Sequence, residues 1–236
     1  MKTKQIIKLA LAAGCLLLAG PLQATLFSYT YTTGFSQTNI PDGNLVGIAD
    51  SRTISGVPDT DVNHTPVITD VNVRLTINGG YNGDLYGYLR LKDENNNTVL
   101  TVLLNRVGQG TGSEPVTSFG YADAGLNITL DDAGTAFGNI HNYATNASYA
   151  TKISDGSSFQ PDGAGLSAFN TAYRANGTWT LFLADMSGGG GQSSLASWGL
   201  DINVVPEPVT WAIIIFGLLV GLVQLARWQQ RRRLAG

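Results

Sequence analysis

Apolar and polar residues alternate with a period of two in several short stretches of this chain. In residues 71–77, valine, leucine and isoleucine occupy every second position, and residues 178–185 and 197–204 repeat the pattern around a tryptophan. Such alternation is typical of strands with one face in a core and the other in water. Less regular apolar stretches predict further strands at Leu26–Thr33, Arg52–Gly56, Leu85–Leu91, Thr98–Leu104 and Leu126–Leu130.

The segments between these predicted strands are rich in Gly, Asn, Asp and Ser, which form turns at little cost. No long amphipathic helix is visible between residues 25 and 205. About eight short strands without intervening helices predict an all-β domain, a β-sandwich or jelly roll. Trp179 and Trp198 alternate in phase with Leu and Ile, which favours a place in the core over a role as sugar-stacking platforms.

The two ends of the chain have the composition of targeting segments. Met1 to Ala24 holds three lysines, an apolar run from Leu9 to Ala19 and a small residue at its end, which predicts a signal peptide cleaved after Ala24. The only cysteine, Cys15, lies inside this segment. The exported part, residues 25–205, must therefore be stable without disulfides.

At the other end, an apolar run from Val209 to Ala226 is interrupted only by Thr210 and Gln224. Its length predicts one transmembrane helix, and the arginines that follow it are expected to stay in the cytoplasm. The prolines of Pro206-Glu207-Pro208 prevent the helix from extending backwards. A permanent single-pass anchor would satisfy this pattern.

The order of these parts closely resembles the PEP-CTERM sorting signal of Gram-negative bacteria. The motif is Pro206, Glu207 and Pro208, followed by the apolar helix and the cluster of Arg231, Arg232 and Arg233. The resemblance implies that an exosortase, a membrane cysteine protease, recognises residues 206–236 and removes them. It further implies transit through the inner membrane, then delivery to the periplasm, cell surface or extracellular matrix. Bacteria with this signal commonly make exopolysaccharide, so a biofilm or matrix role is expected.

A second resemblance covers roughly Phe35 to Val204. The stretches "NIPDGNLVGIADSRTISG", "ITDVNVRLTI", "YNGDL", "LLNRVG", "NGTWTLFLAD" and "SLASWGLDI" occur in the order of the P/Homo B domain. In subtilisin-like proprotein convertases and many secreted bacterial proteases, this jelly-roll module follows the catalytic domain. The resemblance implies a jelly roll over residues 25–205. The sequence departs from the family pattern before "YNGDL", at "KDENNNT" and at "GGGGQSS".

Charge limits the partners of the exported part. Residues 25–205 hold seven basic and sixteen acidic residues, a net charge of −9. This excludes nucleic acid, which needs a Lys/Arg surface, and favours cations. Asp42, Asp84 and Asp185 each stand at the end of a strand and match acidic positions of the P/Homo B pattern. We expect them to bind Ca²⁺, which accepts six to eight oxygen ligands; the alternative is three separate turn residues.

Catalysis is not indicated. His64 and His141 are the only histidines, and neither stands near a recognisable nucleophile motif. The sequence therefore predicts an exported, non-catalytic binding or structural module, with exopolysaccharide or other envelope proteins as partners. A hydrolase with an unrecognised site and a permanently anchored envelope protein stay open as alternatives.

Overall fold

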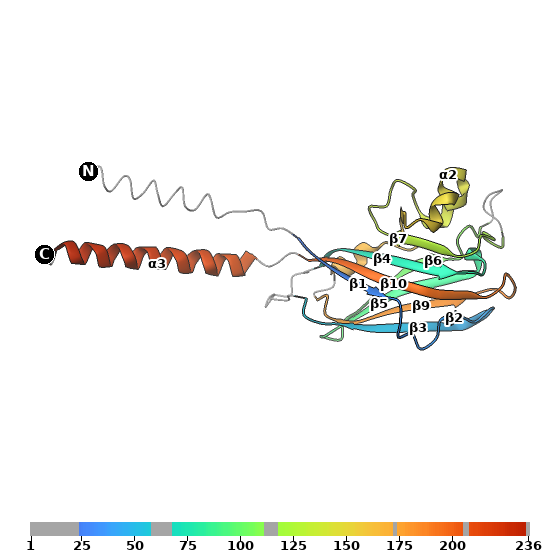
Figure 1. The fold of residues 1–236 in the computed structure, drawn as a ribbon, viewed down its shortest axis with the longest axis horizontal. Coiled ribbons are helices and arrows are strands. Elements are labelled where there is room, and N and C mark those ends of the chain that lie inside the picture. The colour runs from blue at the N-terminus through green and yellow to red at the C-terminus, as the bar shows by residue number, and fades with distance from the viewer. Residues whose placement is uncertain (1–23, 58–67, 111–117, 172–173, 205–207, 235–236) are drawn as a thin grey trace. The chain divides into compact units, whose positions relative to one another are not determined.

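The structure is a computed structural model, and it describes residues 24–57, 68–110, 118–171, 174–204 and 208–234. The chain divides into two units (Figure 1). One is Thr25–Val204, and the other combines the two ends of the chain, including helix α3 (Pro208–Leu234). The first unit contains every strand among the described residues.

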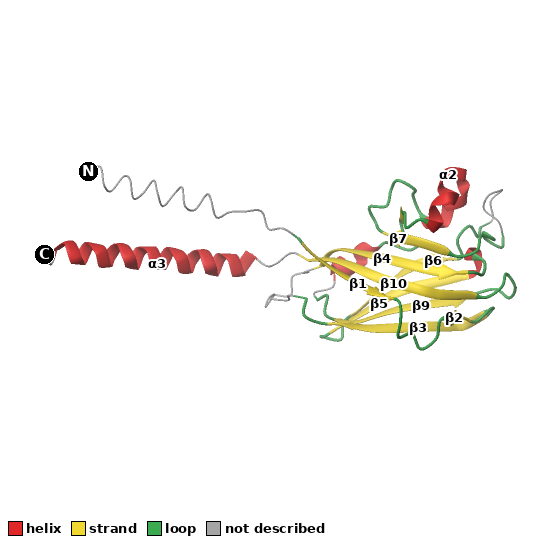
Figure 2. Ribbon diagram, viewed as in Figure 1, coloured by secondary structure: helices red, strands yellow, loops and turns green. Residues whose placement is uncertain are grey.

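The Thr25–Val204 unit is an all-β sandwich of two sheets, drawn as two layers of strands in Figure 2. Sheet A has the order β1-β10-β4-β7-β8, and β2 also pairs with β10. Only β7 and β8 pair in parallel; the other pairs in this sheet are antiparallel. Its strands are β1 (Thr25–Tyr31), β2 (Asn39–Ile40), β4 (Ile68–Asn78), β7 (Leu126–Leu130), β8 (Ser158–Phe159) and β10 (Ser193–Val204).

Sheet B has four antiparallel strands in the order β3-β9-β5-β6. They are β3 (Asn44–Ile54), β5 (Leu85–Asp93), β6 (Thr98–Asn105) and β9 (Gly177–Asp185). Short helices fill the connections: η1 (Asn82–Asp84), η2 (Ile140–Thr145), α2 (Ala147–Ala150), η3 (Thr151–Ser154) and η4 (Leu166–Thr171).

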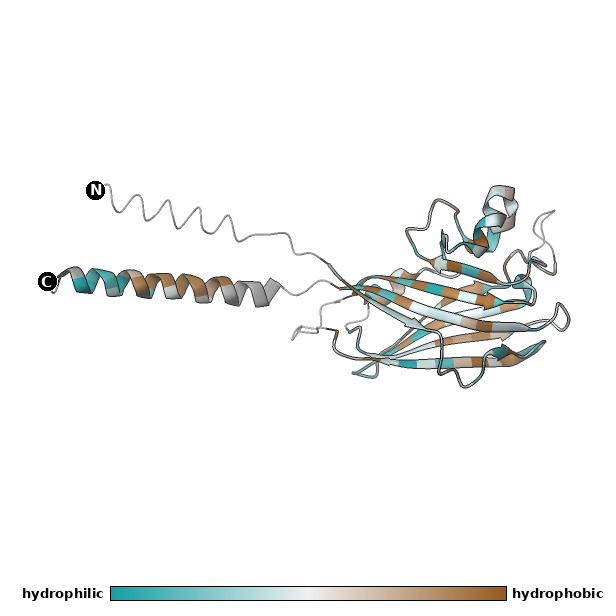
Figure 3. Ribbon diagram, viewed as in Figure 1, coloured by the Kyte–Doolittle hydropathy of each residue, from teal (hydrophilic) through white to brown (hydrophobic). Residues whose placement is uncertain are grey.

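The core lies between the two sheets and follows the period-two pattern of the strands. Alternate residues of β4 and β5 are buried, and in β9 and β10 some of the intervening residues are buried as well. Apolar and polar bands follow one another along the strands in Figure 3. Trp179 is fully buried and packs against Phe169 with 5.1 Å between ring centroids. Trp198 is 1% exposed and packs against Tyr31 at 4.8 Å. The prediction that both tryptophans belong to the core is confirmed.

Helix α3 belongs to the second unit. Its hydropathy changes from apolar in the middle to hydrophilic near its C-terminal end (Figure 3). Within the described residues, no helix is both long enough and apolar enough to cross a membrane. The predicted run Val209–Ala226 begins at residues whose side chains fall outside this description, and so does the predicted signal peptide up to residue 23. Both assignments stay predictions.

Candidate cation site

The three aspartates predicted to bind a cation come together at one end of sheet B. Asp185 ends β9 and pairs with Leu85, the residue directly after Asp84. The backbone amide of Met186 donates to the carbonyl of Asp84 at 2.7 Å, which fixes these two strand ends side by side. Asp42 lies in the turn between β2 and β3, and its neighbour Gly43 donates its amide to Asp185. Strand pairing therefore unites three positions that lie far apart in the sequence.

Asp185 is the most buried of the three, with no exposed surface. Its Oδ1 accepts hydrogen bonds from the amides of Ser187 at 3.1 Å and Gly43 at 3.4 Å. Its Oδ2 is buried and has no hydrogen-bond partner within the described residues. A buried carboxylate oxygen without a partner is costly, because it has lost its water and gained nothing in exchange.

Asp42 and Asp84 have different surroundings. Asp42 is exposed, and its carboxylate accepts from the amide of Gly189 at 3.0 and 3.2 Å. Asp84 is 6% exposed and has a cation near it, because Arg106 Nη2 lies 3.7 Å from Asp84 Oδ1. Arg106 itself is held at positive φ, 51°. Nothing in the sequence pattern pointed to Arg106 as a partner of Asp84.

The electrostatics of the cluster disfavour full ionisation. Burial raises the pKa of Asp84, and the charges of Asp185 and Asp42 raise it further, while Arg106 lowers it. Burial also raises the pKa of Asp185; the amides of Ser187 and Gly43 lower it, and Asp42 raises it. The charge of Asp42 therefore raises the pKa of both Asp84 and Asp185, as expected for acidic groups gathered in one place.

A glycine-rich loop borders this cluster. Residues 188–191 connect β9 to β10. Gly190 has φ +79°, and a Cβ there would approach the ring of Tyr81 and lie 3.0 Å from Asp84 Oδ2. In the sequence, this stretch stood out only as a departure from the P/Homo B pattern at "GGGGQSS". In the structure, the lack of side chains lets the loop lie close to the acidic groups, and its Gly189 amide binds Asp42.

The acidic cluster fits a cation only in part. No group of three or more His, Cys, Asp or Glu side chains in the described part of the chain is placed to hold a metal ion directly. The geometry therefore does not form a complete protein cage. What fits a cation is the orphaned Asp185 Oδ2 beside two further carboxylates, because Ca²⁺ accepts loop carbonyls and water as its remaining ligands. The predicted calcium site stays a prediction.

The histidine that the structure describes has both ring nitrogens engaged. His141 Nδ1 lies 2.9 Å from Asp162 Oδ2, and Nε2 lies 3.0 Å from the carbonyl oxygen of Gln109. A general base in a Ser-His-Asp site needs one nitrogen directed at the nucleophile. Here that nitrogen faces a backbone carbonyl, so His141 serves to join loops. His64 lies outside the described residues.

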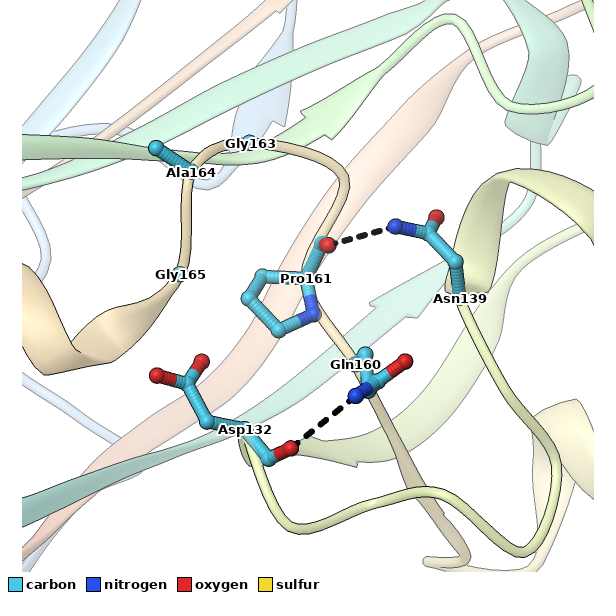
Figure 4. A pocket seen from close by; sticks show the side chains of 7 residues that line it. All are labelled: Asp132, Asn139, Gln160, Pro161, Gly163, Ala164 and Gly165. Carbon is cyan, nitrogen blue, oxygen red and sulfur yellow. Dashed lines mark hydrogen bonds between the residues drawn. The ribbon is translucent and has the colours of Figure 1, made fainter.

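A polar hollow of about 220 Å³ lies elsewhere in the sandwich unit, beside β8 (Figure 4). Its carboxylate, Asp132, accepts from the amides of Leu166 and Ser167 at 2.7 Å each. Asn139 donates to the carbonyl of Pro161, and Gln160 donates to the carbonyl of Asp132. These side chains are used to hold loops together, so the hollow offers no free reactive group.

The predicted sorting residues are only partly within the described structure. Pro206 and Glu207 lie outside it, and Pro208 is the first residue of α3. Arg231 and Arg232 are exposed, and the guanidinium of Arg232 lies 3.8 Å from the ring centre of Trp228. The side chain of Arg233 is outside the described residues.

Comparisons with known proteins give limited results. No protein-family model matches the chain, and no curated protein matches it. Among solved structures it is similar to a serine protease of Aeromonas sobria in complex with its chaperone, at 13% identity, TM-score 0.41, over 83% of this chain and 30% of that one. For the protease alone, the identity is 12% and the TM-score 0.37, over 80% of this chain and 29% of the protease. For the VP2 subviral particle of infectious bursal disease virus, the identity is 12% and the TM-score 0.34, over 80% of this chain and 35% of that one. The chain thus spans about a third of each of these proteins.

Proposed function

We propose that this protein is an exported, non-catalytic β-sandwich module that binds calcium and is sorted by an exosortase to the cell envelope or extracellular matrix. The sandwich would be a jelly roll of the P/Homo B type. In support, "ITDVNVRLTI" covers most of β4, "NGTWTLFLAD" covers β9 and "SLASWGLDI" lies within β10. The quoted motifs thus fall on central strands of the two sheets.

One observation carries the calcium part of the proposal: the buried, unpartnered Oδ2 of Asp185. Three carboxylates and one guanidinium leave an excess of negative charge at this end of the sandwich. A cation there would offset that charge and would give the orphaned oxygen a ligand bond. The ligands would come from the carboxylates of Asp42, Asp84 and Asp185, with loop carbonyls and water completing the shell. Because the described residues do not place three such side chains to hold an ion directly, at least one of the three would act through a water molecule. Calcium suits such a loose oxygen set better than magnesium, which demands a near-ideal octahedron.

Calcium titration of the purified protein tests this. Bound calcium should raise the melting temperature, because an ion that binds only the folded state stabilises it by about 2.7 kcal/mol at one hundred times its dissociation constant. Asp84→Ala should abolish the gain. Asp155→Ala is the matched control, because Asp155 is an exposed carboxylate paired with Lys152 at 2.9 Å, remote in sequence from the three acidic positions. No shift at millimolar calcium would refute the site.

The sorting part of the proposal is supported by the order of Pro206-Glu207-Pro208, the apolar run and Arg231 to Arg233. Exosortase processing should remove the helix, so the mature protein from cells with a working exosortase should lack Trp211 to Arg233 by intact mass. Replacing the three arginines by glutamine should weaken orientation and processing, because they are the main cytoplasmic charges. A tail retained in those cells would favour the permanent anchor instead.

The absence of a free imidazole nitrogen at His141 supports a non-catalytic role. A broad screen of the purified protein against peptides and glycans checks it, and turnover by the wild type would favour the hydrolase alternative. In the matrix or envelope, such a module would act by binding exopolysaccharide or neighbouring envelope proteins.

A further inference from the structure

The outward faces of the two sheets differ in kind. On sheet A, the outward side chains of β4 are Asn72, Arg74 and Thr76, all polar, and Arg74 is neutralised by Asp201 at 2.9 Å. This is an ordinary solvated face. On sheet B, by contrast, Tyr86, Tyr88 and Phe182 project outward between core-facing leucines and are only half buried.

Two of these aromatic residues, Tyr88 and Phe182, belong to a row that crosses the whole sheet, and Tyr86 lies beside it. Strand register places Ala49, Phe182, Tyr88 and Val102 next to one another on β3, β9, β5 and β6. The rings of Tyr88 and Phe182 are stacked, with centroids 4.8 Å apart and planes 16° apart, and Tyr86 meets Tyr88 edge-on at 6.4 Å. The row therefore presents a fixed, apolar strip to solvent.

Cations lie directly beside this strip. The next two rows along β5 contain Arg90 and Lys92, both exposed, and the structure records no ion pair for either within the described residues. Their neighbours in these rows are hydroxyl-bearing or apolar, and none is acidic: Ser51, Thr53, Thr98, Leu100, Thr178 and Thr180. Although the unit has a net charge of −9, these rows of sheet B contain no carboxylate and two cations that have no ion pair within the described residues.

The face continues into a hollow of about 330 Å³ that Thr53, Lys92 and Thr178 help to line. The acidic residues of this hollow are already engaged. Glu94 pairs with Arg174 at 3.4 Å, and Asp93 accepts from the amides of Asn95 and Asn97. From Tyr86 to Lys92 this face of β5 is about 20 Å long, at 3.4 Å per residue. The exposed face along β5 is therefore elongated.

We infer that this face of sheet B binds an acidic polysaccharide, and the inference rests on the proposed role in the envelope or matrix. Sugar rings present apolar C–H faces to aromatic side chains, and their hydroxyls pair with the serine, threonine and tyrosine hydroxyls, which both donate and accept. Carboxylates on the sugar would pair with Arg90 and Lys92. The ligand class is a uronic-acid polymer.

The size of the strip argues against a protein as its occupant. A fully buried aromatic side chain covers about 150–250 Å², so three half-buried rings and their aliphatic neighbours leave only about 300 Å² of apolar surface. A stable protein interface needs about 800 Å² on each partner. A second copy of the chain would also have to place the cations of one face near those of the other, which is unfavourable.

The test uses the purified full-length protein in mild detergent, with EDTA present so that calcium cannot bridge an anion to the acidic cluster. Polygalacturonate is the probe, and its methyl ester is the matched ligand without charge. The wild type should bind polygalacturonate in affinity electrophoresis or calorimetry, more weakly at higher salt, and should bind the methyl ester far less.

Tyr88→Ala and Phe182→Ala should each weaken this binding by about tenfold or more. Arg90→Gln, which leaves the aromatic row intact, should remove most of the preference for the charged polymer. Phe119→Ala is the matched control, because Phe119 is 78% exposed and outside sheet B, and it should leave binding unchanged. A thermal melt of each variant shows that the fold is retained.

Three outcomes would overturn the inference: no binding by the wild type, equal binding by the Tyr88 and Phe119 variants, or equal affinity for the charged and esterified polymers. A dimer of the wild type that Tyr88→Ala dissociates, measured by light scattering, would also overturn it by assigning the face to a second copy. None of these results depends on calcium binding or on tail removal. The proposed function can therefore fail or stand separately.

Discussion

Replacing Trp198 by phenylalanine should destabilise the sandwich more than the same change at Trp179. Both indoles are buried, and both lose the same atoms. They differ in the acceptor of the indole N–H. Trp198 donates to the carboxylate of Asp50 at 2.7 Å, whereas Trp179 donates to the neutral carbonyl of Ala175 at 2.9 Å. The comparison therefore isolates the effect of a charged acceptor.

The magnitude follows from these contacts. A hydrogen bond to a charged group contributes about 1.5–3 kcal/mol to stability, and a neutral one about 0.5–1.5 kcal/mol. Asp50 is only 8% exposed, so water replaces the lost donor poorly, although Arg52 Nε still contacts the same oxygen at 2.7 Å. We expect the Trp198 variant to lose about 1–2 kcal/mol more than the Trp179 variant, on top of a similar cavity cost.

Urea denaturation of the 25–204 unit, followed by far-ultraviolet circular dichroism, measures both losses. Near the melting midpoint, the difference should correspond to about 2–8 °C for a domain of this size. Asp50→Asn combined with Trp198→Phe closes a double-mutant cycle, and the coupling between the two changes should be at least about 0.5 kcal/mol. Equal losses for the two phenylalanine variants, with no coupling to Asp50, would refute the reasoning.

Two further predictions concern the acidic end and a strand bulge. Because the pKa values of Asp84 and Asp185 are raised above 3.8 in the folded state, protonation there stabilises the fold. That stabilisation is complete below pH 3.8 and is lost as the pH rises through the folded pKa values of the two aspartates. Without calcium, the contribution of Asp84 and Asp185 to the free energy of unfolding should therefore fall with rising pH. Melting temperatures with EDTA should show this fall, Asp84→Asn should reduce it, and an identical pH profile for that variant would contradict it. Gly47 has φ +56°, and a Cβ there would collide with the carbonyl of Leu183. Gly47→Ala should thus cost clearly more than Gly156→Ala, a matched change at φ +84° with open space around it, for which about 1 kcal/mol is expected; equal melting of the two variants would contradict the clash.

The regular strands were well predicted from the sequence because one face of each strand packs in the core and the other faces water. β7 matches the predicted Leu126–Leu130, and β5, β6, β9 and β10 begin or end within a few residues of the predicted positions. β3 is much longer than the predicted Arg52–Gly56, since it starts at Asn44. Its first residues are largely exposed and lie before an irregularity in the pairing with β9, so their side chains carry no clear alternation.

The two-residue strands β2 and β8 could not be predicted, because a period cannot be recognised in two residues. The residues of the candidate cation site also include some that the sequence could indicate and some that it could not. Its three aspartates were identifiable as strand-end residues, but Arg106 and the amide of Gly189 were not. Those contacts arise from backbone conformation in loops, which side-chain patterns do not encode. The aromatic row on sheet B was also hidden, because its members become neighbours only through strand register.

The position of β10 has a mechanical consequence. It runs between β1 and β4, with Val204 at one end, where Thr25 pairs with it, and Ser193 at the other, next to the acidic end of the sandwich. A pull on Val204 directed away from Ser193 acts along the axis of this strand, which is about 35 Å long. The hydrogen bonds to both neighbours are perpendicular to that axis. They would bear the load in shear and all at once, so the module is arranged to withstand tension rather than to unzip under it.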